Sequence, residues 1–471
     1  MKVLTRIVLS VVAVVVVLVV AVVGALMWFN IPQNAAGMAA ETVCSAVFVA
    51  GREPDAQQIM ADDVLPASGV LKAISTEIDP ANKTVSARFL GLFGRTAALA
   101  PDRGCVLDLS PDPTAEGYQP PPLDPAPWPT GDAVAPSASS AALEKVVDAA
   151  FDGAGDPTAA NARGVAVVQG DQLLAAREGT GFEPNVALHG WSMTKTIGAM
   201  LFYKKAQEVG LDLNTPVVAA IPADRAPSWV AQWRQDGRDQ ITVADLLFMR
   251  DGLDINEGYD PTGDVVQMLY GEPDMSGWAA EHRLKAQPGT QWEYLSATSN
   301  ILAAVTRSLF ATDEEYLRYA RTSLFTPLAA DSATLQTDTV GTWVASSYQW
   351  ASVRDWAKFG RLMLNDGQWQ GQQVIPSGWW ELAGTPAMSS GPGVGYGAQT
   401  WRIGDPVEGA CKDTPGVPAD TLAMEGHWGQ IVAMVPSRDA VVVRLGWTFE
   451  KGQFDQCQFV SDVLAALPAK G

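Results

Sequence analysis

A serine and a lysine three positions apart are the residues of this chain best suited to nucleophilic chemistry. Ser192 and Lys195 stand in the stretch GWSMTKT, just before an apolar run that is typical of a helix. Residues three apart on a helix share a face, so the amine would reach the hydroxyl. A serine becomes a nucleophile when a base takes its proton, and a lysine can be that base when burial lowers its pKa. The spacing therefore predicts a serine nucleophile with a lysine base.

The pair alone also fits a capped helix with a solvated lysine, and two further segments favour the chemical interpretation. They are PGTQWEYLS, which contains Tyr294 and Ser296, and GHWGQ, which begins at Gly426. Together the three segments resemble the motifs of the penicillin-recognising serine hydrolases, which are Ser-x-x-Lys, Tyr-x-Asn or Tyr-x-Ser, and Lys/His-x-Gly. Their order and spacing are similar to the branch that contains class C β-lactamases, related esterases and 6-aminohexanoate-dimer hydrolases. Two flanking stretches, LLFMRDGL and SVRDWAKFGRLMLNDGQWQGQQVIP, extend the resemblance to about residues 141–468.

The resemblance implies a role for each matched residue of the reaction centre. Ser192 is the implied nucleophile and Lys195 its base. Tyr294 takes the place of the catalytic tyrosine, whose phenolate-like oxygen shares or relays the proton. The backbone N–H groups of Ser192 and Gln430 would form the oxyanion hole, where losing one donor typically costs ~3–4 kcal/mol of transition-state stabilisation.

The same resemblance implies four substrate-binding residues: Ser296, His427, Trp428 and Gly429. Ser296 occupies the position of the class C asparagine, and His427 that of the lysine in the third motif. Gly429 would let the backbone approach the substrate. Because both replacements remove groups that class C enzymes use to hold a β-lactam, the implied substrate is a small amide or ester.

Some neighbouring residues are open to two interpretations. Asp254, Glu257 and Asp260 either face the cleft and bind a cationic amine or form a solvated acidic loop. Three tryptophans adjoin the motifs and could line an apolar pocket: Trp191, Trp292 and Trp428. The sequence has no Cys-x-x-Cys and no tight Cys/His cluster, so we expect no metal and no other cofactor.

The N-terminal segment predicts a membrane anchor. Lys2 and Arg6 precede an apolar run over residues 7–29 that only Ser10 interrupts. About 20 apolar residues suffice to cross a bilayer as a helix, and basic residues on the first side place that side in the cytoplasm. We expect residues 1–31 to anchor the chain in a bacterial inner membrane, with the remainder in the periplasm. Cleavage near AAGMAA, which would release a secreted protein, is the alternative.

The four cysteines, Cys44, Cys105, Cys411 and Cys457, predict disulfides in an exported chain. Four cysteines allow three pairings. Pairing within each segment, Cys44 with Cys105 and Cys411 with Cys457, is the simplest. Each closed loop would then contribute ~4 kcal/mol in the chain-entropy model.

The remaining chain predicts an α+β fold in several parts. Residues 32–110 read as a small disulfide-linked α+β domain, residues 111–140 as a proline-rich linker, and residues 141–471 as the hydrolase-like domain. In the last of these, the order is helix, hairpin, long helical insert, hairpin and helix. That order favours a β-lactamase/transpeptidase-like antiparallel sheet flanked by helices, closed by its two ends and accompanied by a helical lobe.

These observations lead to one main functional hypothesis and two alternatives. The main hypothesis is an extracytoplasmic serine hydrolase that cleaves a small amide or ester through an acyl-enzyme. The alternatives are a non-catalytic penicillin-binding-like sensor and a D,D-peptidase or D-amino-acid amidase. The net charge of −20 argues against a nucleic-acid partner.

Overall fold

The computed structural model describes residues 6–7, 9–14, 17, 24, 26–112, 114–135, 140–152, 160–449 and 452–468. Among these residues there is no helix of the length and apolar character needed to cross a membrane. The predicted anchor over residues 7–29 lies in part outside the described residues. It therefore stays a prediction.

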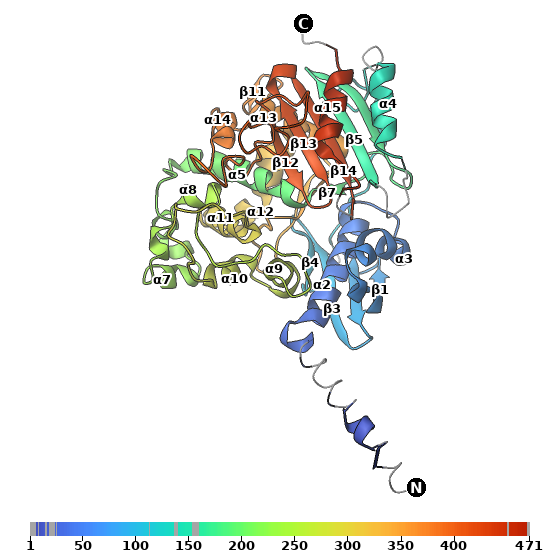
Figure 1. Cartoon of the computed structure of the whole chain (residues 1–471), viewed down its shortest axis with the longest axis vertical. Helices are drawn as coiled ribbons and strands as arrows, with labels where there is room; N and C mark the ends of the chain where they lie inside the picture. Colours follow the sequence, from blue (N-terminus) through green and yellow to red (C-terminus); the bar gives the residue numbers. More distant parts are fainter. Residues whose placement is uncertain are drawn as a thin grey trace.

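A five-stranded antiparallel sheet forms the centre of the C-terminal part of the molecule (Figure 1). In spatial order its strands are β12 (Leu422–Gly426), β13 (Gln430–Val435), β14 (Ala440–Gly446), β5 (Ala162–Gln169) and β6 (Gln172–Glu178). Strands from the two ends of this part meet at the β14–β5 pair, where Val443 lies opposite Ala166. Both predicted hairpins are confirmed, as β5–β6 and β13–β14.

Helices cover both faces of this sheet. Helix α13 (Val353–Leu364) packs against β5, β13 and β14 on one face, and α4 (Ala141–Ala149) and α15 (Gln456–Ala466) lie together on the other (Figure 1). Every residue of β13 and β14 is buried. A strand covered on both faces is apolar on both, which explains the continuous runs QIVAMV and AVVV.

A lobe of short helices lies beside the sheet (Figure 1). Its helices are α5 (Thr194–Val209), α6 (Val217–Ala220), α7 (Trp229–Trp233), α8 (Val243–Leu247), α9 (Asp264–Gly271), α10 (Met275–Glu281), α11 (Ser296–Ser308), α12 (Asp313–Ala320) and α14 (Trp379–Gly384). Short strands connect them: β7 (Leu188–His189), β8 (Thr334–Leu335), β9 (Gln349–Ala351), β10 (Gln368–Trp369) and β11 (Gln372–Gln373). Sheet and lobe together confirm the predicted α+β architecture.

Residues 31–107, which we call the N-terminal unit, form a second sheet with its own helices. The elements are α2 (Ile31–Cys44), α3 (Ala56–Ile59), β1 (Ile74–Asp79), β2 (Thr84–Phe89), β3 (Phe93–Ala100) and β4 (Gly104–Leu107). The strands follow one another in an antiparallel meander, and α2 crosses β2 and β3. The other side of α2 packs on α9, and a side chain at Gly37 would place its Cβ only 2.6 Å from the carbonyl oxygen of Tyr270. Small residues on α2 thus let it lie between its own sheet and the lobe.

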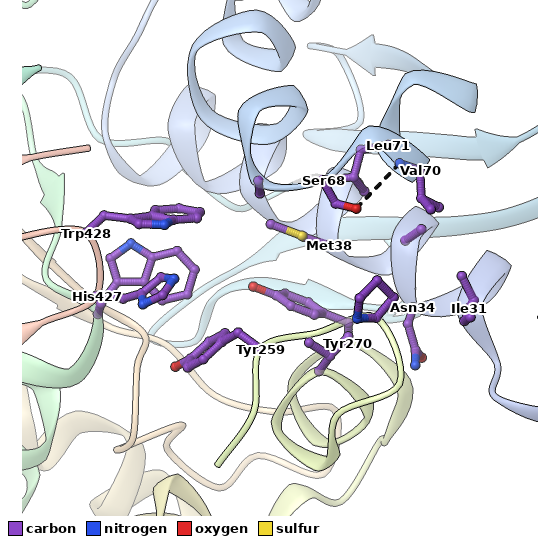
Figure 2. Close-up of a pocket in the computed structure, with 15 residues that line it drawn as sticks. Ile31, Asn34, Met38, Ser68, Val70, Leu71, Tyr259, Tyr270, His427 and Trp428 are labelled. Carbon is purple, nitrogen blue, oxygen red and sulfur yellow. Dashed lines mark hydrogen bonds between the residues drawn. The ribbon is translucent and has the colours of Figure 1, made fainter. Parts of the chain in front are cut away.

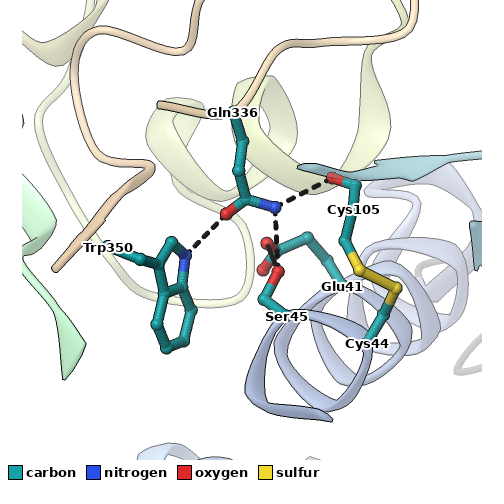
Figure 3. Close-up of a disulfide and its surroundings, with 6 residues drawn as sticks. All are labelled: Glu41, Cys44, Ser45, Cys105, Gln336 and Trp350. Atoms are coloured by element: carbon teal, nitrogen blue, oxygen red, sulfur yellow. Dashed lines mark hydrogen bonds between the residues drawn. A yellow bond between two sulfur atoms is a disulfide. The ribbon is translucent and has the colours of Figure 1, made fainter. Parts of the chain in front are cut away.

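A buried polar network joins the N-terminal unit to the lobe (Figure 3). Gln336 Nε2 donates to Ser45 Oγ at 2.9 Å and to the carbonyl oxygen of Cys105 at 3.0 Å. Trp350 Nε1 donates to Gln336 Oε1 at 2.6 Å. Glu41 accepts the Ser45 hydroxyl at 2.7 Å, and burial raises the pKa of this carboxyl to about 7. Each of these side-chain donors has a partner, so the contact is specific rather than merely apolar.

The cysteines pair within their segments. Cys44 on α2 bonds to Cys105 on β4, and Cys411 bonds to Cys457 on α15. The simplest of the three possible pairings is therefore confirmed. The first disulfide fixes α2 to the edge strand of its sheet, and the second fixes the loop before β12 to the last helix.

Candidate active site

Ser192 lies in a single 3₁₀ turn, Trp191–Met193, between β7 and α5. The α-helix begins after this turn, so the serine precedes the helix instead of sitting within it. The turn has little freedom, because a Cβ on Gly190 would lie 2.2 Å from the indole of Trp356. Ser192 itself is half-buried, which leaves its hydroxyl within reach of a ligand.

Lys195 points at the Ser192 hydroxyl, as the spacing predicts. Its Nζ donates to Ser192 Oγ at 2.9 Å, to Ser296 Oγ at 3.0 Å and to the carbonyl oxygen of Ser346 at 3.0 Å. Three acceptors match the three protons of an ammonium. Burial lowers the pKa of Lys195 to about 8, and the nearby Glu257 carboxylate opposes that shift. The amine therefore gives up its proton far more easily than an exposed lysine does.

Tyr294 completes the predicted trio. It lies in the extended segment before α11, with its ring centroid 4.8 Å from Lys195 Nζ and stacked on Trp401 at 5.2 Å. Burial raises the pKa of Tyr294 well above its usual range, and the Ser192 hydroxyl only partly offsets this. The structure thus brings the three side chains together, with the tyrosine as a neutral phenol rather than a phenolate.

Ser296 lies behind the lysine. It is fully buried, its Oγ donates to Glu257 Oε1 at 2.5 Å, and its backbone N–H donates to Glu257 Oε2 at 2.6 Å. Its hydroxyl therefore links the amine of Lys195 to a carboxylate. Of the acidic loop, Glu257 faces the site, whereas Asp254 and Asp260 are exposed.

Tyr259 is a site residue that the sequence did not indicate. Its ring stacks on His427 at 4.4 Å with an interplanar angle of 12°. Its hydroxyl is buried near those of Ser192, Ser296 and Ser347, yet it forms no hydrogen bond of good geometry with any described residue. Burial raises the pKa of this phenol, so it is a neutral donor. Its only signal in the sequence is its place in the acidic loop.

The third motif lies against the nucleophile turn. A Cβ on Gly426 would be 2.3 Å from the carbonyl oxygen of Gly190, so β12 approaches the turn backbone to backbone. Gln430, at the start of β13, holds its neighbours with its side chain: Nε2 donates to the carbonyl oxygen of His427 at 3.0 Å, and Oε1 accepts the N–H of Gly446 at 2.9 Å. These bonds fix the start of β13, the strand that contacts the nucleophile turn.

A buried arginine supports the His-Trp-Gly turn. Arg444 Nη1 donates to the carbonyl oxygens of Gly429 at 2.8 Å and Trp428 at 3.3 Å. A Cβ on Gly429 would come within 2.8 Å of the same Nη1. Gly429 thus makes room for the arginine. Burial lowers the pKa of His427 to about 4, so the imidazole is neutral at pH 7 and brings no positive charge to the site.

An apolar pocket opens beside this turn (Figure 2). Trp191 and Trp428, whose ring centroids are 5.2 Å apart, contribute to its wall together with His427 and Tyr259. Trp292 is not part of that wall and packs on Tyr396 at 5.5 Å. Of the three tryptophans that could line an apolar pocket, Trp191 and Trp428 do so and Trp292 does not. Among the described residues no group of three or more His, Cys, Asp or Glu could hold a metal ion.

Comparisons with known proteins identify the family of the chain. The family model described as "Beta-lactamase" matches residues 145–457. A 6-aminohexanoate-dimer hydrolase from Paenarthrobacter ureafaciens is 27% identical over 304 residues, which cover 59% of this chain and 71% of that protein.

Solved structures share the fold at low identity. A putative 6-aminohexanoate-dimer hydrolase from Bacillus anthracis superimposes with a TM-score of 0.54 at 18% identity, over 69% of this chain and 80% of that one. A family VIII carboxylesterase gives a TM-score of 0.53 at 14% identity, over 70% of this chain and 98% of the other. At these identities the likeness concerns the fold.

Proposed function

The chain belongs to the β-lactamase family, and on that premise we propose that it is a serine hydrolase that cleaves a small amide or ester through an acyl-enzyme on Ser192. The observation that carries the proposal is the 2.9 Å hydrogen bond between Lys195 Nζ and Ser192 Oγ at a lysine whose pKa is lowered to about 8. An amine with that pKa is partly neutral at physiological pH and can accept the serine proton.

The proposed acylation begins at this pair. Neutral Lys195 takes the proton of the Ser192 hydroxyl while Oγ attacks the substrate carbonyl carbon. The oxygen of that carbonyl becomes an oxyanion, which the backbone N–H groups of Ser192 and Gln430 would stabilise. The close approach of β12 to the nucleophile turn supports this assignment.

Tyr294 is the proposed donor to the leaving group. Because its pKa is raised, it holds a proton that it can give to the departing nitrogen or oxygen, and Lys195 can return one to it. The carbon–leaving-group bond breaks and an ester to Ser192 remains. Water then attacks the ester carbonyl and gives its proton to the same relay. The bond between Ser192 Oγ and the acyl carbon breaks, Oγ takes the proton from the relay, and the acid leaves.

Ser296 and Glu257 are proposed positioning residues. The carboxylate holds the Ser296 hydroxyl, and that hydroxyl accepts from Lys195 Nζ. The negative charge of Glu257 also keeps the pKa of Lys195 from falling further. The buried, unpartnered hydroxyl of Tyr259 is free to donate to a bound substrate.

The neutral His427 supports a substrate without the carboxylate of a β-lactam. A cation is the usual partner of a carboxylate, and the pKa of this imidazole is lowered to about 4 by burial. We therefore expect turnover of simple esters and amides, and poor turnover of penicillins.

Intact-mass measurement with a fluorophosphonate tests the proposal. The wild-type chain should gain one adduct and turn over p-nitrophenyl esters steadily, and Ser192→Ala should do neither. If the wild-type chain forms no adduct, the proposal that it is a serine hydrolase is wrong. An adduct without turnover identifies a penicillin-binding-like sensor, and release of D-alanine from D-Ala-D-Ala peptides identifies a D,D-peptidase.

We also propose that residues 1–31 hold the protein in a bacterial inner membrane with the catalytic part in the periplasm. The two disulfides support this, because such bonds persist in oxidising compartments. Protease added to spheroplasts should degrade the catalytic part. Protection from that protease, or free thiols at Cys44 and Cys105, contradicts the location.

A further inference from the structure

The apolar pocket beside the nucleophile turn is shared by two parts of the chain. One wall consists of Trp191, Tyr259 and the turn at His427 and Trp428. The opposite wall is the N-terminal unit, through Met38 on α2 and the lining residues Ala67, Ser68, Val70 and Leu71 (Figure 2). The catalytic part alone therefore forms only half of this pocket.

The pocket shares two residues with the surroundings of the nucleophile. Trp191 directly precedes Ser192 in the turn. Tyr259 lines the pocket (Figure 2). Its hydroxyl lies near the Ser192 hydroxyl. Tyr259 therefore adjoins both the pocket and the nucleophile.

The lining sets the chemistry of a group that can bind in the pocket. No Asp, Glu, Lys or Arg is among the described residues that line the pocket. His427, the one titratable imidazole there, is neutral at pH 7, because burial lowers its pKa to about 4. An ammonium or carboxylate placed here would have no partner of opposite charge, and burying an unpaired charge is strongly unfavourable.

The volume of the pocket limits the length of the substrate group that it can hold. The pocket has a volume of about 150 Å³. An apolar cavity of about that volume accommodates benzene, which has six carbons. Each methylene moved from water into such a site strengthens binding about fourfold.

We propose that this pocket binds an uncharged aliphatic arm of about six carbons on the substrate, and that the N-terminal unit selects for it. The inference rests on the proposed hydrolysis at Ser192 and specifies its substrate class. It assigns a function to residues 31–71, which lie outside the part of the chain matched by the family model.

Two ester series on the full-length chain test the arm. One places the chain on the acyl side, as p-nitrophenyl acetate, hexanoate and 6-aminohexanoate. The other places it on the leaving side, as methyl and n-hexyl acetate. We expect kcat/KM at least about tenfold higher for the six-carbon ester than for the short one in one series, well within the ~250-fold that four further methylenes give at about fourfold each. The 6-aminohexanoate ester should be no better than the acetate.

Substitutions in the N-terminal unit test whether that unit selects the arm. Val70→Trp fills the pocket, and Ala67→Trp places an indole at its mouth from an exposed position. Each should lower kcat/KM for the preferred six-carbon ester about tenfold and leave the short ester within twofold. Leu92→Trp, at a turn residue that is 75% exposed and does not line the pocket, should change neither.

The outcomes separate the two proposals. Hydrolysis of short esters with no chain-length preference in either series overturns the pocket assignment and leaves the hydrolase intact. A preference for 6-aminohexanoate also overturns the pocket assignment, as does a six-carbon preference that survives both Ala67→Trp and Val70→Trp. Failure of the wild-type chain to hydrolyse any ester overturns both proposals.

Discussion

The two ends of the site are built in different ways. At the polar end, Ser192, Lys195, Ser296 and Glu257 form a chain of hydrogen bonds of 2.5–3.0 Å within the lobe and its first helix. At the apolar end, residues 31–71 and residues 427–428 face each other across a pocket, with no ionised side chain among the described lining. The two proposals therefore assign the chemistry to the first arrangement and the selection of the substrate to the second.

The largest effect should come from removing the amine at the polar end. Lys195→Ala should lower kcat for short and six-carbon esters alike by about 10³-fold, because a general base is lost. Steady-state kinetics measure this. Lys205→Ala, on the same helix and paired with Glu208, should retain activity. A Lys195→Ala variant with near-wild-type turnover would remove the basis for the proton-transfer assignment.

The next effect concerns stability at the apolar end. Replacing Cys44 and Cys105 by serine opens a 61-residue separation, and the free energy of unfolding should fall by about 4 kcal/mol. Because α2 carries Cys44 and one pocket wall, the six-carbon preference should fall as well. Urea unfolding measures the loss of free energy of unfolding, and the two ester series measure the loss of chain-length preference.

The second disulfide provides the matched control. Replacing Cys411 and Cys457, separated by 46 residues, should cost a similar free energy of about 4 kcal/mol and leave chain-length preference unchanged. Equal loss of preference in both double variants would contradict the separation between the two ends.

Tyr294→Phe should have a smaller effect, lowering kcat about 10²-fold for every ester, because the proton donor is lost and the ring stacking on Trp401 remains. Tyr396→Phe, whose ring centroid is 5.8 Å from that of Tyr294, serves as the control and should stay within a few-fold of wild type. Unchanged turnover in Tyr294→Phe would show that another group donates the proton to the leaving group.

The smallest effect is a displacement of the pH profile. Lys195 must be neutral to act, so kcat/KM should rise with pH through an apparent pKa of about 8. The charge of Glu257 stabilises the ammonium and raises that pKa. Glu257→Gln should therefore move the rise to lower pH, while Asp254→Asn on the exposed part of the same loop should not. A shift to higher pH would show that the sign of the coupling is wrong.

The polar end was largely accessible from the sequence. Ser192 and Lys195 are close in the chain, so helical spacing alone predicts their contact. The hairpins β5–β6 and β13–β14 were also predictable, because turn residues, Gly170 in one and Ser437 in the other, separate their strands. The resemblance supplied Tyr294, which the structure places over Lys195.

What escaped sequence reasoning depends on side-chain direction or on long-range packing. Nothing in the pattern separates Glu257, which turns inward, from Asp254 and Asp260, which remain exposed. The full burial of Ser296 depends on how α11 packs beneath the acidic loop. The pocket wall that contains Met38, Val70 and Leu71 forms only when two surfaces remote in sequence meet, and no local motif predicts that contact.

The covalent connectivity of the chain has a consequence for that wall. Each disulfide closes a loop on one side of residues 108–140, and the pairs use all four cysteines. The backbone of that segment is therefore the sole covalent bridge between the two surfaces. A single protease cut there should yield two fragments on a denaturing gel without reductant, while a native gel keeps them together through the contacts of Gln336 and Gly37. After such a cut, the N-terminal fragment binds the catalytic fragment reversibly. The fraction of molecules with a complete pocket then depends on fragment concentration and on a dissociation constant.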